Sequence, residues 1–353
     1  MSQPGHNLPF DGFVTTSGFE PALIAEMSDM WDASVEPGPG LVLAERRATD
    51  GGIRDLVFAR QRIPGAVEVR APSVQQLAEA AYQVIEGGID GGESPFTLHV
   101  WPAVADPMLG SRVGLVGRQL LDLLKTRRRR AYRSYRVPAE MPSVWAPGVR
   151  LIQLVALERE RLLVSAATAR ALPRGGTDLA PWPAGSAPIA LDKAPPSRAY
   201  QKLEEAFAWL DEAPTAGQTC VDLGGAPGGW ALTALKRGAR VTAIDRAPLE
   251  PPAAGHPRLT AMIGNAFTFE PPKPVDWLLC DVVCEPARTL QLIARWLDRR
   301  WCRRLVVTVK FKGRAGYGVL AEVDPLFAAA GWRFARTKQL LHNKNEVTVL
   351  GKA

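Results

Sequence analysis

The feature that most constrains the fold is a glycine-rich stretch, CVDLGGAPGGW, at residues 220–230. A short apolar run ends in an acid, and two Gly-Gly pairs follow, separated by Ala226 and Pro227. Each glycine costs conformational entropy on folding, so the stretch implies a tight turn or a ligand that approaches the backbone closely. The pattern predicts a strand, a turn and a helix whose first backbone N–H groups are available to a ligand.

Residues 198–353 continue as apolar strands that alternate with helices. We expect helices at 197–210, 228–238, 286–301 and 317–331, and strands at 219–224, 239–245, 259–264, 275–281, 303–310, 332–341 and 345–350. This alternation indicates an α/β domain with a doubly wound, mostly parallel, seven-stranded sheet. The last two strands are expected to form a hairpin at a mixed edge.

The first half of the chain predicts a smaller α+β region. It shows strands at 56–62 and 94–103, a helix at 73–87 and a β-hairpin at 149–168. We divide it into an N-terminal subdomain, 1–70, and a basic subdomain, 71–172. Residues 173–197 are rich in Pro, Gly and Ala, which is typical of a linker, so the α/β domain is expected to span 198–353.

Positive charge is concentrated in one segment of the basic subdomain. The chain carries a net charge of +7, and residues 112–136 contain nine lysines and arginines against one acid, Asp122. A polyanion is the natural partner of such a segment. Arginines can bind RNA phosphates, and the interleaved Tyr132 and Tyr135 can stack on bases. The alternative interpretation of this segment is a basic helix end that is simply exposed to solvent. The candidate RNA-binding residues here are Arg127, Arg128, Arg129, Arg130, Arg133 and Arg136.

Other classes of protein are disfavoured. No run of about 18 apolar residues predicts a membrane span, and the N-terminus lacks the charged and apolar regions of a signal peptide, so we expect a cytoplasmic protein. The four cysteines form no CxxC pair and the four histidines are scattered, so no structural metal is expected.

The glycine-rich stretch also indicates which class of ligand it binds. A dinucleotide-binding G-x-G-x-x-G pattern fails, because Ala226 stands at its second glycine and Pro227 lies in the turn. The stretch resembles motif I of S-adenosylmethionine (SAM)-dependent methyltransferases; a purely structural turn is the alternative. Asp222 would hold the turn or the cofactor amine, Asp245 would accept bonds from a ribose diol, and Trp230 is expected to pack the helix. The remaining cofactor-binding candidates of the turn are Gly224, Gly225, Ala226, Pro227, Gly228 and Gly229.

Four charged residues complete a second pattern. Asp281 and Lys310 each end a strand, at the edge where open α/β sheets bind ligands. With Lys202 and Glu346 they resemble the catalytic tetrad of FtsJ-type RNA ribose 2′-O-methyltransferases, and PSRAYQKLEEAF resembles that family's SR-x-x-x-KL segment. The resemblance implies in-line methyl transfer from SAM, with Lys310 as base or as the group that orients the hydroxyl, and Asp281 also near the cofactor. The sequence leaves open which of these two roles Lys310 has.

Nearly the whole chain resembles the RlmM family, through GFEPALIAEM, LVFARQRI, the basic region and the FtsJ-like domain. The resemblance implies a THUMP-containing N-terminal region and a 23S rRNA substrate: a cytidine in the peptidyl-transferase loop, methylated before subunit assembly. Asn265 stands where that family has an Asp that reads adenine. Lys312 and Arg314 would guide RNA into the crevice or simply be solvated. Alternatives are a tRNA or other RNA substrate, and a non-catalytic SAM-sensing RNA-binding assembly factor; a small-molecule methyltransferase leaves the basic segment unexplained.

Overall fold

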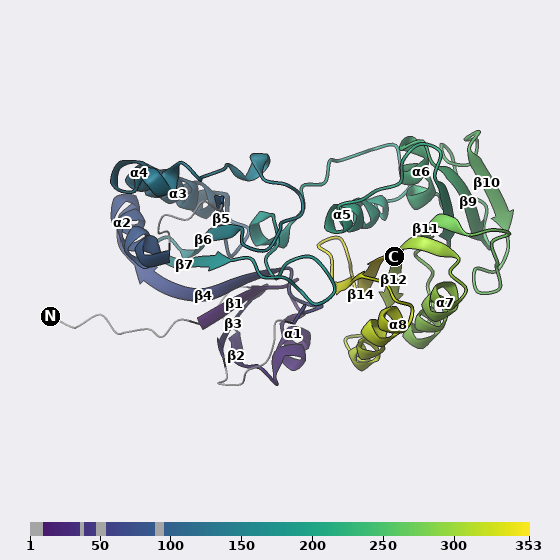
Figure 1. Cartoon of the computed structure of the whole chain (residues 1–353), viewed down its shortest axis with the longest axis horizontal. Coiled ribbons are helices and arrows are strands. Elements are labelled where there is room, and N and C mark those ends of the chain that lie inside the picture. The colour runs from purple at the N-terminus through teal and green to yellow at the C-terminus, as the bar shows by residue number, and fades with distance from the viewer. Residues whose placement is uncertain (1–9, 36–38, 47–53, 89–94) are drawn as a thin grey trace. The chain divides into compact units, whose positions relative to one another are not determined.

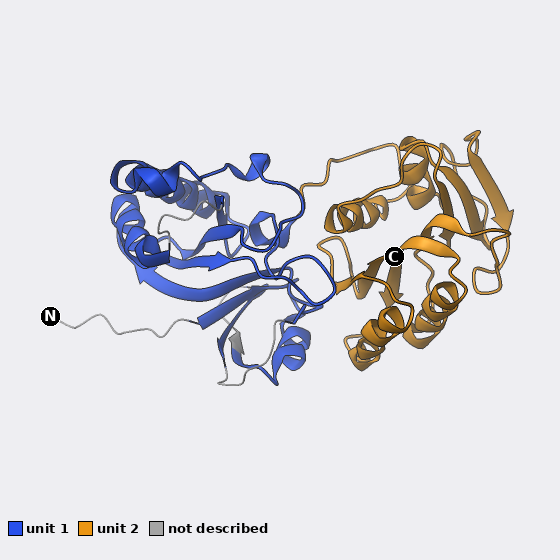
Figure 2. Ribbon diagram, in the orientation of Figure 1, with its two compact units in different colours: residues 1–186 blue, residues 187–353 orange. Residues whose placement is uncertain are grey.

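The computed structural model describes residues 10–35, 39–46, 54–88 and 95–353. The first nine residues of the predicted N-terminal subdomain therefore lie outside it. The chain divides into two compact units, residues 1–186 and 187–353 (Figure 2). Within the described ranges, no helix is both long enough and apolar enough to cross a bilayer.

The first unit contains a seven-stranded sheet in the order β2-β3-β1-β4-β7-β6-β5, in which only β5 and β6 are parallel (Figure 1). Helices α2 and α3 pack on one face of it, where Leu77, Ile85 and Leu120 meet Leu98 and Ile152. The elements are β1 (Phe10–Val14), α1 (Glu20–Met27), β2 (Trp31–Val35), β3 (Leu41–Arg46), β4 (Gln61–Arg70), α2 (Val74–Ile85), β5 (Phe96–Pro102), α3 (Pro107–Arg127), α4 (Arg129–Tyr132), β6 (Arg150–Glu158) and β7 (Arg161–Thr168), with short 3-10 turns at Glu86–Gly88, Pro138–Glu140 and Pro183–Gly185.

The division within this unit differs from the one expected. β4 pairs with β1 on one side and with β7 on the other, so one sheet runs through the expected boundary at residue 70. The expected linker also begins later, because residues up to 186 pack on the first unit. Gln61 explains this: its side chain exchanges two 3.0 Å hydrogen bonds with the backbone of Ala180, and Trp182 is buried nearby.

The strand predicted at 56–62 is wrong over most of its length, since β4 begins only at Gln61. The side chain of Glu26 accepts hydrogen bonds from the backbone N–H groups of Val57 and Phe58, at 2.6 and 3.0 Å. The apolar run is thus a loop fastened to α1, because its backbone groups find partners outside any sheet.

The second unit confirms the predicted α/β class. Its sheet has the order β10-β9-β8-β11-β12-β14-β13; the first five strands are parallel, and β14 runs antiparallel between β12 and β13. Helices α5 and α6 lie on one face and α7 and α8 on the other (Figure 1). The elements are α5 (Tyr200–Leu210), β8 (Thr219–Leu223), α6 (Gly229–Lys236), β9 (Arg240–Asp245), β10 (Leu259–Ile263), β11 (Val275–Cys280), α7 (Pro286–Asp298), β12 (Cys302–Lys310), the 3-10 turn η4 (Tyr317–Glu322), α8 (Val323–Ala329), β13 (Phe334–Lys338) and β14 (Glu346–Lys352).

The strand order reverses between β8 and β11. The chain leaves β8 toward β9 and β10, and leaves β11 toward β12, so the connections diverge at this point. Such a switch point opens a crevice beyond the carboxyl ends of the strands, where open α/β sheets bind ligands. The glycine-rich turn follows β8 and Asp281 follows β11, so both lie at this crevice.

Candidate active site

The glycine-rich turn fits backbone conformations that other residues rarely adopt. Gly224 has a φ of +77°, and a Cβ on it would lie 2.8 Å from Cγ2 of Val282. Gly228 has a φ of +120° and caps the N-terminus of α6. These positions need glycine because the left-handed region penalises a Cβ, and at Gly224 the neighbouring strand end also leaves no room for one.

Asp222 lies beneath the turn rather than in the open crevice. Its side chain is fully buried, and its Oδ2 lies 3.2 Å from the position that a Cβ on Gly225 would take. Burial, reinforced by the negative charge of Asp281, raises the pKa of Asp222 from 3.8 to about 8. Both carboxylate oxygens of Asp222 are buried without a hydrogen-bond partner among the described residues, so its expected role, to hold the turn or the cofactor amine, stays a prediction.

A cavity of about 340 Å³ lies at the switch point. Gly224, Asp245, Asn265, Phe267 and Asp281 are among the residues that line it. Asp245 Oδ2 accepts a 3.0 Å hydrogen bond from the backbone of Ala226 in the turn. The volume falls in the range of small-molecule sites, and the lining combines apolar walls with a few polar groups, as such sites do.

Two of the cofactor-binding candidates make local contacts. Asn265 Oδ1 accepts a 3.0 Å hydrogen bond from the backbone of Phe267, so this oxygen shapes its own loop. Trp230 is buried, and its indole N–H donates to the carbonyl of Ala199 at 2.8 Å. Trp230 thus links the start of α6 to the residue before α5.

Four charged side chains form a ring beside this cavity. The ammonium of Lys202 lies 3.0 Å from Asp281 Oδ2 and 2.9 Å from Glu346 Oε1. The ammonium of Lys310 lies 2.9 Å from Asp281 Oδ1 and 3.8 Å from Glu346 Oε2. Lys310 and Glu346 are opposite partners in the β12–β14 ladder. We call these four residues the charged ring; the structure brings together all the members that the sequence singled out.

The charges within the ring keep Lys202 and Asp281 ionised against the effect of burial. Burial lowers the pKa of Lys202, but the charges of Asp281 and Glu346 outweigh it, so the pKa is raised overall. Burial raises the pKa of Asp281, but the charges of Lys202 and Lys310 outweigh it, so the pKa is lowered. Lys202 is nearly buried, whereas 20% of the Lys310 side chain is exposed. Of the two lysines in the ring, Lys310 is therefore the more accessible one.

Further residues that sequence reasoning missed hold the ring in place. The hydroxyl of Thr308 donates a 2.6 Å hydrogen bond to Asp281 Oδ1. The amide of Asn343 lies 3.5 Å from Glu346 Oε1. The signal for Thr308 was a polar residue inside an apolar strand, two positions before Lys310 and hence on the same face. Asn343 lies in a loop and gave no signal of this kind.

The candidate RNA-binding residues differ in how far other groups neutralise them. Arg127 pairs with Glu79 at 2.6 Å, and Arg128 pairs with Glu86 at 2.8 Å. On the second unit Lys312 pairs with Glu285 at 2.8 Å. Arg314, two residues further on, is also exposed. Four arginines of the basic segment have exposed side chains and no carboxylate partner within the described residues; they are Arg129, Arg130, Arg133 and Arg136.

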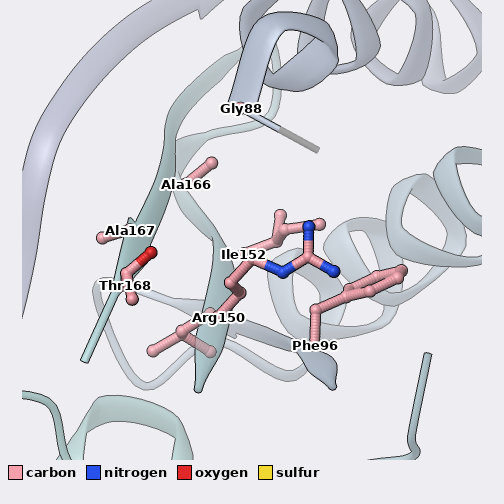
Figure 3. Close-up of a pocket in the computed structure, with 8 residues that line it drawn as sticks. Gly88, Phe96, Arg150, Ile152, Ala166, Ala167 and Thr168 are labelled. Carbon is pink, nitrogen blue, oxygen red and sulfur yellow. The ribbon is translucent and has the colours of Figure 1, made fainter. Parts of the chain in front are cut away.

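A small cavity adjoins the basic segment. It has a volume of about 190 Å³, and Phe96, Arg150, Ile152 and Thr168 are among its lining residues (Figure 3). The backbone N–H of Phe96 donates a hydrogen bond to the carbonyl of Ser134, so the basic segment runs past this cavity.

Across the described residues, no group of three or more His, Cys, Asp or Glu side chains is arranged to hold a metal ion.

Comparisons with known proteins show which family has this architecture. A family model described as FtsJ-like methyltransferase matches residues 195–304. The ribosomal RNA large subunit methyltransferase M of Laribacter hongkongensis is 32% identical over 329 residues, which cover 89% of this chain and 86% of that protein. The protein of the same name from Alkalilimnicola ehrlichii is 38% identical over 180 residues, covering 48% of this chain and 49% of its own length.

Solved structures are more distant. TrmN from Thermus thermophilus aligns over 98% of this chain and 99% of its own, with 18% identity and a TM-score of 0.38, which is too low to bear on the assignment. The Laribacter protein aligns over most of both chains, and this confirms the family resemblance seen in the sequence. The chain belongs to the ribosomal RNA large subunit methyltransferase M family, and its second unit is an FtsJ-like, Rossmann-type methyltransferase domain.

Proposed function

We propose that the protein transfers a methyl group from SAM to a ribose 2′-oxygen of 23S rRNA. The observation that carries the proposal is the charged ring of Lys202, Asp281, Lys310 and Glu346 beside the switch-point cavity. The name shared by the relatives supports large-subunit rRNA as the substrate. A cytidine in the peptidyl-transferase loop as the target, and methylation before subunit assembly, rest on the family resemblance.

The residues around the cavity fit SAM. The turn at Gly224 has no side chain to obstruct a ligand, and the Phe267 ring offers an apolar wall for an adenine. Asp245 keeps acceptor capacity for a ribose diol beyond its bonds to the backbone of Ala226 and Ala247. Asp281 lines the same cavity and would face the cofactor there. SAM supplies the reactive methyl group when bound.

The charged ring would act on the ribose hydroxyl. A 2′-hydroxyl is a weak nucleophile and must lose its proton as it attacks a methyl group. Lys310 is the more exposed lysine and forms an ion pair with Asp281, so we assign it the charged role: it orients the hydroxyl oxygen and stabilises the negative charge that develops there. The hydroxyl proton would pass to solvent water, which can reach the partly exposed Lys310. Most of the remaining gain would come from alignment, with reacting atoms held about 3–3.5 Å apart.

The first unit would bind the rest of the RNA. Arg129, Arg130, Arg133 and Arg136 would contact phosphates, because they have no carboxylate partner within the described residues. Tyr132 and Tyr135 stack on each other with ring centroids 5.8 Å apart, which limits their role as separate platforms for bases. On the catalytic unit, Lys312 and Arg314 would guide the strand toward Lys310.

The test is methyl transfer from labelled SAM to three substrates: deproteinised, unmodified 23S rRNA, assembled large subunits, and tRNA. We expect label on the 23S rRNA, recovered as 2′-O-methylcytidine after digestion to nucleosides, and little on assembled subunits. Label on tRNA alone would replace the rRNA substrate by tRNA. Binding of SAM with no transfer to any RNA would favour the non-catalytic assembly factor instead.

A further inference from the structure

Glu205 of α5 is a buried carboxylate outside the charged ring. Its side chain is fully buried. Its oxygens accept hydrogen bonds from the backbone N–H groups of Leu341 and His342, at 2.8 and 3.1 Å, and Nδ1 of the His342 ring lies 2.8 Å away. All these contacts come from residues 339–345, which we call the β13–β14 loop. A carboxylate is costly to bury unless its bonds are made, and the bonds of Glu205 are made to this loop.

The β13–β14 loop leads directly into Glu346. Within it, Asn343 Oδ1 accepts a 2.7 Å hydrogen bond from the backbone of Leu340, while the Asn343 amide faces Glu346 Oε1 at 3.5 Å. A shift of the loop would therefore move Glu346 both through the chain and through Asn343.

Helix α5 holds this region at two points. Glu205 follows Lys202 by three positions, so the two side chains lie on the same face of the helix. Lys202 binds the carboxylate of Glu346 at 2.9 Å, and Glu205 binds the loop just before it. The helix that supplies one cation of the ring thus also fixes the approach to one of its anions.

The position of Glu346 is sensitive to such support. Its carboxylate lies 2.9 Å from the Lys202 ammonium but 3.8 Å from that of Lys310. A shift of the order of 1 Å would change which lysine it neutralises. Catalytic groups work only when held within about 0.5 Å of the productive geometry, and a misplacement of about 1 Å can cost on the order of 100-fold in rate.

We propose that Glu205 is a positioning residue for methyl transfer, which fixes the β13–β14 loop and thereby the carboxylate of Glu346 in the charged ring. The inference rests on the proposed function, since the ring needs this support only if it is catalytic. Glu205 acts through the loop, because its hydrogen bonds within the described residues go to Leu341 and His342.

The experiment compares full-length Glu205→Ala and Glu205→Gln with a matched control, Glu204→Ala. Glu204 is the neighbouring carboxylate on the same helix, and it pairs with Arg237 at 2.9 Å instead of with the loop. Four quantities are measured: the single-turnover rate of methyl transfer to 23S rRNA, the KM for this RNA, the Kd for S-adenosylhomocysteine, and Tm.

We expect Glu205→Ala to lower the rate by about 10- to 100-fold, as loss of supporting residues does at other sites. The Kd for S-adenosylhomocysteine and the KM for RNA should stay within about twofold. Glu205→Gln retains one acceptor oxygen and should restore a large part of the rate, because the loop keeps one of its backbone bonds. Glu204→Ala should transfer at the wild-type rate.

Three results would overturn the inference. One is a folded Glu205→Ala that transfers at the wild-type rate. Another is a parallel loss of rate, S-adenosylhomocysteine binding and Tm in both Glu205 variants, which would mean a general structural role. If Glu205→Ala does not fold, Glu205→Gln decides: a rate measurably below that of the wild type with an unchanged Kd for S-adenosylhomocysteine supports the inference, and a rate equal to that of the wild type overturns it. The third is a wild-type protein that methylates no RNA, which would contradict both the proposed function and this inference. An active wild type with unaffected Glu205 variants would contradict this inference alone.

Discussion

At the scale of single residues, the sequence brought out the charged ring but not its supports. Asp281 and Lys310 are recognisable because each ends a strand at the edge where open α/β sheets bind ligands, whereas Lys202 and Glu346 were added by the resemblance to the FtsJ-type tetrad. Glu205 was visible only as a carboxylate among the apolar positions of an amphipathic helix. Its partners are backbone N–H groups of a distant loop, and a residue pattern carries no information about such contacts.

The burial of Asp222 predicts a pH dependence of stability. The pKa of Asp222 is about 8 in the folded chain and near 3.8 when it is unfolded, so between these values the folded state keeps a proton that the unfolded state has lost. The stability of the wild type therefore falls as pH rises through this window. Asp222→Asn has the same shape and no such titration, so the variant should gain stability relative to the wild type with rising pH.

Urea unfolding at pH 5 and pH 8 measures this effect. The difference in free energy of unfolding between Asp222→Asn and the wild type should change by more than about 1.4 kcal/mol, the equivalent of one pKa unit. An equal difference at both pH values would contradict the proton bound by Asp222 in the folded state.

At the scale of elements, periodicity predicted most helices and strands because their apolar positions are regular. The β6–β7 hairpin, α2 and most strands and helices of the second unit follow the expected ranges closely, but the helix expected at 317–331 is a 3-10 turn up to Glu322 and an α-helix only over Val323–Ala329. The strand prediction at 56–60 was wrong because this apolar run has the pattern of a strand, whereas its backbone N–H groups donate hydrogen bonds to Glu26. The insertion of β14 between β12 and β13 was also out of reach, because sheet order depends on contacts between elements far apart in the chain.

The N-terminus of α3 offers a test at this scale. Asp106 caps the helix: its Oδ1 accepts hydrogen bonds from the backbone N–H groups of Met108 and Leu109, at 2.8 and 3.2 Å. Asp106→Ala should lower the free energy of unfolding by about 1 kcal/mol. Asp122→Ala, at an exposed acid in the middle of the same helix, should change it by less than about 0.5 kcal/mol. Equal effects in a urea titration would rule out the capping role.

At the scale of the whole molecule, the chain separates its charge patterns between two units. The basic segment lies in the first unit and the charged ring in the second. The sequence indicated this separation through the composition of the basic segment and through the motifs of the second half. It did not predict that one sheet runs through the whole first unit. That sheet forms because β4 pairs with both β1 and β7, and a residue pattern does not show which strands pair.

The basic segment predicts how salt weakens RNA binding. Each phosphate contact adds about 0.7–0.9 to the slope of log K against log salt concentration. Replacing Arg129, Arg130, Arg133 and Arg136 with alanine should lower this slope by about 3–4, because their charges have no carboxylate partner within the described residues. A matched control removes four exposed arginines of the second unit, Arg299, Arg300, Arg303 and Arg333, and should lower it by less than half as much. Equal slopes for the two variants, from filter binding, would show that net charge alone governs binding.

The central claim is that the charged ring performs the chemistry, and Lys310 tests it most directly. The measurement is single-turnover methyl transfer to unmodified 23S rRNA by Lys310→Ala, together with its Kd for S-adenosylhomocysteine. Lys344→Ala, at an exposed lysine in the β13–β14 loop, is the matched control. We predict at least about a 100-fold loss of rate for Lys310→Ala, with its Kd within about threefold of the wild type and no loss of rate for Lys344→Ala. A Lys310→Ala protein that binds S-adenosylhomocysteine normally and transfers methyl groups within tenfold of the wild-type rate would contradict the account.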